Sequence, residues 1–416
     1  MSQGLAARAK STTLNAPSRR NEARFRGGSR IGFDSVPERA RFDVKDMQAT
    51  KATLQQRPDA TAIDWRTAIP EQHRRSIRTW LWSIAAMTFG IIVIGGITRL
   101  TLSGLSIVEW RPFTGVIPPL SEAEWLETFE LYKQYPEYQT WRTGMTLAEF
   151  KFIFFWEYVH RLVARLIGVV FLVPFIWFWL KGRLTPPLRR RALALFGLGA
   201  AQGLMGWLMV MSGLVDRPSV SHYRLAAHFV LALTILGYAT WLALELRIRE
   251  ARTSIALELR SLLKRGLAAV GVLLTLQVVW GAFTAGLKAG HFYPTFPLMG
   301  GALAPPDLLR LEPALRNFVD NPPAVQWTHR VIGTLLALAI VAFAVRVFRR
   351  VSDPVSRRYA AGLLAIVLVQ YLLGVLTVIN LVPISLGVAH QAVAAILVLG
   401  WLGWVHHVHN LQPAAG

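Results

Sequence analysis

The chain has 416 residues, 53% of them hydrophobic and 17% charged, with a formal net charge of +21 and no cysteine. The charged share is well below the roughly 25% of globular domains, and the mean hydropathy is +0.38, which indicates an integral membrane protein. The lack of cysteine excludes disulfides, cysteine-ligated zinc, iron–sulfur clusters and covalently attached c-type haem. A metal or haem would therefore be held by His, Met, Tyr or carboxylate groups.

Residues 1–76 are polar and hold 15 Lys/Arg against 8 Asp/Glu. No apolar stretch follows the first residues, so we expect no cleaved secretory signal. The first thirty residues are rich in arginine, as in a mitochondrial transit peptide, but Glu38, Asp43 and Asp46 dilute that pattern. We predict a mostly disordered basic tail on the cytosolic side.

Eight later stretches have the roughly 20 apolar residues that a membrane-spanning helix needs. They are 78–100, 156–180, 191–213, 222–246, 266–288, 327–348, 359–381 and 385–406. The sequence therefore predicts an all-α membrane protein with eight transmembrane helices, surrounded by a lipid bilayer.

Basic residues are distributed unevenly between these stretches. Residues 181–191, 247–265 and 346–358 carry five, six and five Lys/Arg, whereas 101–154 and 289–325 carry four and two, against seven and three acidic residues. Because Lys and Arg concentrate on the cytoplasmic side of a membrane, both termini are expected to be cytoplasmic, or in the matrix, and the two long connections outside. The positive charge thus reports topology, and we expect no nucleic-acid partner.

The chain also repeats itself. The matching segments are Tyr158–Leu162 with Trp327–Val331, Gln202–Gly206 with Gln370–Gly374, Ala227–His228 with Ala389–His390, and, more loosely, Gly95 and Thr98 with Gly281 and Thr284. Four spans in each half place the second half in the same orientation as the first. We predict two pseudo-symmetric four-helix bundles as a parallel repeat, comprising residues 77–250 and 251–416.

Four histidines lie on the even-numbered spans near their outward ends: His160, His228, His329 and His390. A lone histidine in an apolar helix is often a packing residue, but a pair that returns in a repeat favours function, since ionisable groups are costly in a membrane. Facing imidazoles from two helices can supply both axial ligands of a haem iron, so the pattern predicts two haem sites. Zinc or copper fits less well, because each half offers one histidine from each of two helices.

The halves differ next to the first histidine of each pair. Glu157 stands three residues before His160, and Gln326 stands three residues before His329. Because positions i and i+3 share a helix face, we expect the side chains of Glu157 and Gln326 to face the ligand sites of their halves. A carboxylate can move protons, so the N-terminal site is predicted to do chemistry; alternatively, Glu157 is a solvated helix-start residue favoured by the helix dipole.

Four arginines near these histidines could pair with haem propionates or instead extend to the membrane interface. They are Arg99, Arg161, Arg165 and Arg330. The C-terminal His406, His407 and His409 are interpreted as a solvated tail rather than a metal site.

The long connection 101–154 and the residues on either side of it contain distinctive motifs. This segment reads Gly95-Gly96-Ile97-Thr98-Arg99-Leu100-Thr101, then Ser103-Gly104-Leu105-Ser106, and ends in Glu157-Tyr158-Val159-His160-Arg161. With the four histidines and the four-plus-four repeat, residues 78–406 resemble the haem A synthase family, in its cysteine-free proteobacterial and mitochondrial branch.

The resemblance implies an oxidoreductase that converts the C8 methyl of haem O to a formyl, through an alcohol and a hydrate, and so makes haem A for terminal oxidases. It implies that His160 and His228 hold haem O, that His329 and His390 hold a haem b that relays electrons, and that Glu157 is the required glutamate. Haem O synthase and cytochrome oxidase assembly factors would be partners, and a homo-oligomer is possible within the family. The expected location is the inner membrane of a bacterium, or alternatively of a mitochondrion.

Two other functions remain open on the residues alone. A di-haem b-type cytochrome that passes quinol electrons outward would explain the four histidines, but not the single glutamate or the long loop. A haem carrier without redox turnover would explain the histidines too and would need exchangeable haem at both sites.

Overall fold

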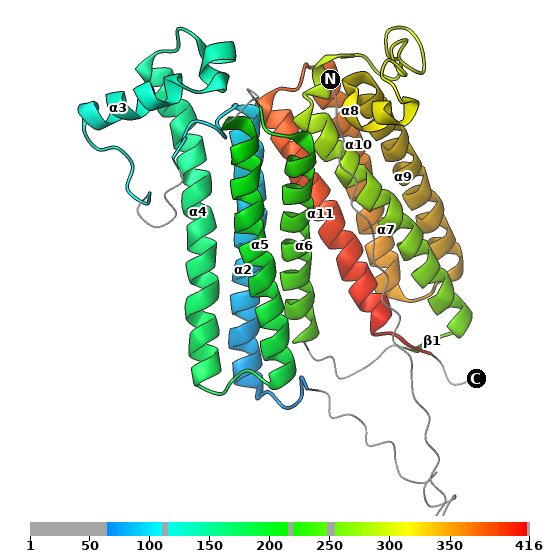
Figure 1. Cartoon of the computed structure of the whole chain (residues 1–416). Coiled ribbons are helices and arrows are strands. Elements are labelled where there is room, and N and C mark those ends of the chain that lie inside the picture. Colours follow the sequence, from blue (N-terminus) through cyan, green and yellow to red (C-terminus); the bar gives the residue numbers. More distant parts are fainter. Residues whose placement is uncertain (1–64, 110–114, 215–218, 248–253, 414–416) are drawn as a thin grey trace, which may run out of the picture. The chain divides into compact units, whose positions relative to one another are not determined.

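The computed structural model describes residues 65–109, 115–214, 219–247 and 254–413; most of the predicted basic tail, residues 1–64, lies outside them. Eight helices in the described residues are long and apolar enough to cross a membrane (Figure 1). They are α2 (Glu71–Leu100), α4 (Leu147–Leu180), α5 (Pro186–Leu214), α6 (His222–Glu245), α7 (Leu257–Gly286), α9 (Pro322–Arg350), α10 (Pro354–Ile379) and α11 (Ile384–His409). The predicted all-α membrane fold is confirmed.

Successive long helices alternate in direction, so their ends define two sides (Figure 1). The loop side carries the short elements α3 (Glu122–Lys133), η1 (Tyr138–Arg142), η2 (Ala289–His291), η3 (Ala314–Arg316) and α8 (Asn317–Asp320). The basic side carries the arginine-rich connections. There β1 (Ser254–Ile255), just before α7, pairs in parallel with β2 (Gln412–Pro413), just after α11.

Six of the eight long helices begin at least five residues earlier than hydropathy predicts, α4 and α7 by nine residues. Helix α2 starts at Glu71, inside the predicted tail, and α4 starts at Leu147, inside the predicted loop. In α4 a capping box explains the difference, because Thr146 accepts from the Glu149 amide and Glu149 accepts from the Thr146 amide. Such a box satisfies two of the free amides at a helix start, so the helix can extend beyond the apolar stretch.

Contacts between the long helices fall mostly within each half of the chain. In the first half α2 contacts α4 and α6, and α5 contacts α6; in the second half α7 contacts α9 and α11, and α10 contacts α9 and α11. The halves meet where α6 and α11 pack together and against α7 and α2. The pseudo-symmetry of the two bundles stays a prediction.

The interpretation of the C-terminal histidines as a solvated tail is wrong for His407. Its side chain is buried, and its Nε2 lies 2.8 Å from Oδ2 of Asp353, the residue that caps α10. His406 packs edge-on against the ring of Trp241. Helix α11 continues to His409, so these residues lie on a packed helix end.

Candidate functional site

Each of the four predicted ligand histidines packs its ring against a glycine of a neighbouring helix. A Cβ atom on the glycine would lie only 3.0–3.2 Å from Cε1 of the imidazole. The pairs are Gly95 with His160, Gly206 with His228, Gly281 with His329, and Gly374 with His390. A side chain at these glycines would crowd the imidazole, so the ring would have to move by a few tenths of an ångström.

Three of these histidines also face a glutamine one turn from the glycine. The Nε2 atoms of Gln202, Gln277 and Gln370 lie 3.2, 3.3 and 3.4 Å from the Nε2 atoms of His228, His329 and His390. The fourth position of this pattern, four residues before Gly95, is Ile91. His160 is thus the one predicted ligand whose matching neighbour is apolar.

The histidines of the second half fit a shared metal. The ring centroids of His329 and His390 are 6.4 Å apart, with the rings nearly perpendicular at 81°. Two imidazoles that bind one metal ion at about 2 Å have centroids about 6 Å apart, so the pair suits a bis-histidine iron. Among the described residues, no group of three or more His, Cys, Asp or Glu forms a metal site.

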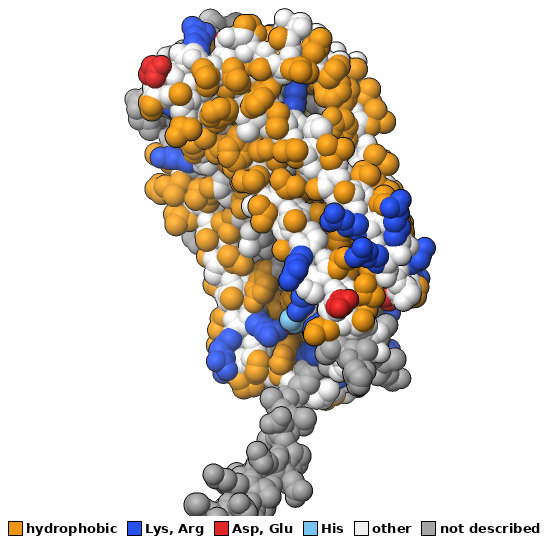
Figure 2. Space-filling view, turned by 90° about the vertical axis from the view of Figure 1, so that its right-hand side faces the viewer, with side chains coloured by type: hydrophobic (Ala, Val, Ile, Leu, Met, Phe, Trp, Pro, Cys, Tyr) orange, Lys and Arg blue, Asp and Glu red, His pale blue; other side chains and the backbone are white. Residues whose placement is uncertain are grey.

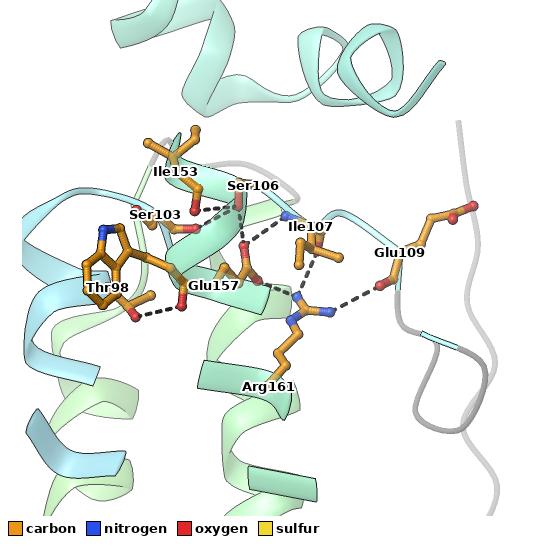
Figure 3. Close-up of polar contacts among 9 residues, drawn as sticks. Thr98, Ser103, Ser106, Ile107, Glu109, Ile153, Glu157 and Arg161 are labelled. Carbon is orange, nitrogen blue, oxygen red and sulfur yellow. Dashed lines mark hydrogen bonds and ion pairs between the residues drawn. The ribbon is translucent and has the colours of Figure 1, made fainter. Parts of the chain in front are cut away.

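Glu157 is buried well inside α4, with 3% of its surface exposed, so the alternative of a solvated helix-start residue is wrong. One of its oxygens, Oε2, accepts from the Ser106 hydroxyl at 2.7 Å and from the Ile107 amide at 2.8 Å. The other, Oε1, pairs with the Arg161 guanidinium at 2.5 Å (Figure 3). These contacts turn the carboxylate toward the loop that follows α2 as well as toward its own helix.

In each half an arginine holds the loop that follows the first helix of that half. Arg161 donates to the carbonyls of Ile107 at 2.7 Å and Glu109 at 3.2 Å, as Figure 3 shows. Arg330 donates to the carbonyls of Tyr293 at 2.7 Å and Thr295 at 2.8 Å. These carbonyls lie 186 residues after those that Arg161 contacts, the same offset that relates Gly95 to Gly281.

The position of Glu157 is occupied by an amide in the second half. Gln326 is equally buried and donates from Nε2 to the Tyr293 carbonyl at 3.2 Å. An amide at this position can therefore hold the loop after the first helix of a half. The carboxylate of Glu157 adds a negative charge to this position, and hydrogen-bond donors fix both of its oxygens.

The other two predicted arginines lie nearby. Arg99, at the end of α2, donates from Nη1 to the Ala285 carbonyl at 3.0 Å, across the boundary between the halves. Arg165 lies one turn beyond Arg161 on α4 and is half-buried. Their pairing with propionates stays a prediction.

The loop between α2 and α4 contains a second buried carboxyl that sequence reasoning missed. Glu137 is 4% exposed, and its Oε2 accepts from the Tyr132 hydroxyl at 3.1 Å. Burial raises the pKa of Glu137 to about 7, although Tyr132 and the positive charge of Arg142 act in the opposite direction. The segment Tyr135-Pro136-Glu137 offers no periodicity from which this burial could be read.

Residues 78–402 match the family model of the COX15-CtaA cytochrome oxidase assembly proteins. The chain belongs to this family. Similar relatives, each named haem A synthase, come from Rhodospirillum centenum, Nitrosospira multiformis and Maricaulis maris. They are 46%, 46% and 45% identical to this chain over 326, 325 and 330 residues. The matched region covers 78% of this chain each time, and 86%, 91% and 93% of the respective relative.

The COX15-CtaA match includes both halves of the chain, and with them the four histidines and Glu157. The family that the sequence motifs predicted is therefore confirmed. The roles of the individual site residues stay predictions at this point.

Proposed function

We propose that this chain is a haem A synthase, which oxidises the C8 methyl of haem O to a formyl group. The family match, the names of its relatives and the four glycine-packed histidines support this function. The observation that carries it is the buried Glu157, fixed by three donors, at a position where the other half has an amide. A pure electron-transfer cytochrome would need no such difference between its halves.

The first half is the substrate site in this proposal. His160 and His228 hold haem O, and Arg99, Arg161 and Arg165 are the candidates for its propionates. Ile91 makes the surroundings of His160 more apolar than those of the other three histidines. A less polar ligand environment suits a haem that must leave as product.

The second half holds haem b through His329 and His390, with Arg330 nearby for a propionate. When bound, haem b would relay electrons from or to the substrate site. Gln277 faces His329 and Gln370 faces His390, so each of these two ligands has a polar neighbour, which suits a haem that stays bound.

Glu157 is the group that handles protons or stabilises positive charge at the reacting carbon. The conversion of a methyl to a formyl breaks two C–H bonds. Written as a half-reaction, R–CH3 + H2O gives R–CHO with four protons and four electrons. The electrons would leave through the haem b relay, and the protons need an acceptor. Ser106, Ile107 and Arg161 keep the carboxylate in one orientation, which places its free lone pairs reproducibly. Fixed orientation of a proton acceptor is what makes it efficient.

Location and partners follow from the same proposal. The enzyme would lie in the inner membrane of a bacterium with both termini cytoplasmic. It would receive haem O from a haem O synthase and pass haem A to the factors that assemble the oxidase.

The test is the substitution Glu157→Gln, with Glu127→Gln, at an exposed carboxylate of the loop between α2 and α4, as the matched control. Because the second half uses an amide at this position, Glu157→Gln should fold normally and keep haem b. We expect haem A formation to fall by at least about a hundredfold, as for the loss of a positioned proton-transfer group. The control should make haem A at nearly the normal rate.

Pyridine haemochrome spectra of the purified protein supply the readout. Haem b together with haem O or haem A supports the synthase, whereas haem b alone would favour the cytochrome. Normal haem A in Glu157→Gln, with no intermediate accumulating, would exclude the role given to the glutamate.

A further inference from the structure

An arginine-lined cleft lies on the basic side, at the opposite end of α9 from His329. It measures about 420 Å³ and is lined by Arg346, Arg349 and Arg350 at the end of α9 and by Leu262 near the start of α7. The spacing of three and four residues places the three guanidiniums on adjoining parts of the helix surface. All three arginines are exposed.

Acidic side chains do not neutralise this charge. Among the described residues, the carboxylates of the basic side are Glu71, Glu245, Glu258 and Asp353. Glu71 pairs with Arg74 and Arg75, Glu245 pairs with Arg191, and Asp353 pairs with His407. Glu258 is exposed at the start of α7 and has no ion pair in the described structure. Of the described acids, Glu258 and Asp353 are nearest to the cleft along the chain, and neither forms an ion pair with Arg346, Arg349 or Arg350 in that part of the structure.

An apolar stripe runs along α9 toward the cleft. Leu338, Val341 and Val345 are exposed and follow one another at spacings of three and four residues, and the next step of four reaches Arg349. Residues with this spacing form one line on a helix. Figure 2 shows the corresponding face, with Lys and Arg side chains gathered on its lower half below a broad field of hydrophobic side chains.

We propose that this cleft binds an anionic phospholipid, with its phosphate among the three arginines and an acyl chain along the stripe. Guanidinium groups match phosphate oxygens in geometry and charge, and basic pockets between helices on this side of a membrane suit acidic headgroups. The apolar stripe favours a lipid over free phosphate, because it offers the chains a surface in direct continuation of the charge. Membrane orientation requires basic residues on this side, but it does not require three of them in one cleft.

The experiment titrates the full-length protein in neutral detergent with phosphatidylglycerol or phosphatidylcholine of identical chains, and native mass spectrometry counts the bound lipids. We expect phosphatidylglycerol to bind about tenfold more tightly than phosphatidylcholine, from the attraction of basic side chains for acidic lipid. The triple variant Arg346→Gln, Arg349→Gln, Arg350→Gln should lose this preference.

The matched control removes three exposed cations elsewhere on the basic side, by Lys181→Gln, Arg190→Gln and Arg358→Gln. It should keep the preference, and so should Arg346→Lys, Arg349→Lys, Arg350→Lys, which retains the charge and serves as a second variant should the glutamine triple fold poorly. An equal loss of the preference for phosphatidylglycerol in the cleft variant and in the control would overturn the site, since net charge alone would then explain binding. Displacement of the lipid by equimolar inorganic phosphate would overturn the role of the stripe and leave a simple anion site.

Discussion

The four glycines that face the predicted ligand histidines set how closely two helices approach at each ligand. A Cβ atom 3.0–3.2 Å from a ring carbon is closer than nine in ten real Cβ contacts, so a methyl at such a glycine must push the imidazole by a few tenths of an ångström. Misplacement of a metal ligand weakens the bond to the metal, because the bond length and direction are narrowly defined.

Gly374→Ala therefore should reduce the amount of haem b that co-purifies with the protein, because it displaces His390. Haem affinity is expected to fall about tenfold, or ~1.4 kcal/mol. Gly362→Ala, on the same helix α10, is the control, since a Cβ there has no neighbouring atom within 4 Å. Haem-to-protein ratios from absorption spectra measure the effect, and equal ratios in both variants would contradict the ligand role of His390.

The sequence predicts the histidines and Glu157 because polar residues inside apolar spans are few and the repeat singles them out. It does not predict what holds them. Ser106 and Ile107 lie about fifty positions before Glu157, and only the fold brings their donors to the carboxylate. The prediction of a solvated His407 is wrong for the same reason, because its partner Asp353 precedes it by 54 positions.

At the scale of elements, the loop between α2 and α4 is an ordered structure built on aromatic packing. Phe129 and Tyr132 of α3 stack on Phe150 at the start of α4, with ring centroids 4.8 and 5.3 Å apart. Glu137 is enclosed next to this stack, against the Tyr132 hydroxyl. Burial beside this stack raises the pKa of the Glu137 carboxyl and so favours its protonated form.

We expect the loop to lose stability as the pH rises from about 5 to above 7. Burial raises the pKa of Glu137 to about 7 from an ordinary value of 4.5, so the folded loop holds the proton more tightly than the unfolded chain. The stabilisation is complete below the ordinary pKa and is lost as the pH rises through the folded value. Hydrogen exchange of residues 129–142 at pH 5.5 and 8 measures it.

The isosteric variant Glu137→Gln stays neutral at every pH. Its loop should exchange at a protection level that changes little between the two pH values, after correction for intrinsic exchange rates. A wild-type loop as well protected at pH 8 as at pH 5.5 would argue against a buried carboxyl that titrates near neutrality.

Helix positions follow from hydropathy, and helix ends follow from other forces. All eight apolar stretches became helices because a chain in lipid must satisfy its backbone groups internally. The early start of α4 rests on the Thr146 and Glu149 capping box, which is readable in the sequence but is independent of hydrophobicity. The helix α3 inside the loop begins at a second such box, formed by Ser121 and Glu124.

At the scale of the molecule, the separation of basic connections from the loop side predicts a fixed orientation. The natural chain has no cysteine, so a single introduced cysteine reports its own position without a background. Leu315→Cys on the loop side and Lys181→Cys on the basic side both replace exposed side chains.

In intact cells, a membrane-impermeant maleimide should label Leu315→Cys, whereas Lys181→Cys should be labelled only after the membrane is permeabilised. The reason is that basic connections stay in the cytoplasm. Gel-shift of the labelled protein gives the readout. Labelling of Lys181→Cys in intact cells would reverse the orientation and place the histidine sites on the cytoplasmic half of the bilayer.

The hydrogen bond from Arg99 to Ala285 has a consequence for how the two halves meet. Residues 99 and 285 are counterparts by the offset of 186 that relates Gly95 to Gly281, so Arg99 touches the position that its own duplicate would occupy. In two identical halves around a twofold axis, that contact would bring two guanidiniums together, where like charges repel. In this chain Ala285 stands at the second of these positions, so the two halves meet there with one guanidinium and a backbone carbonyl that accepts from it.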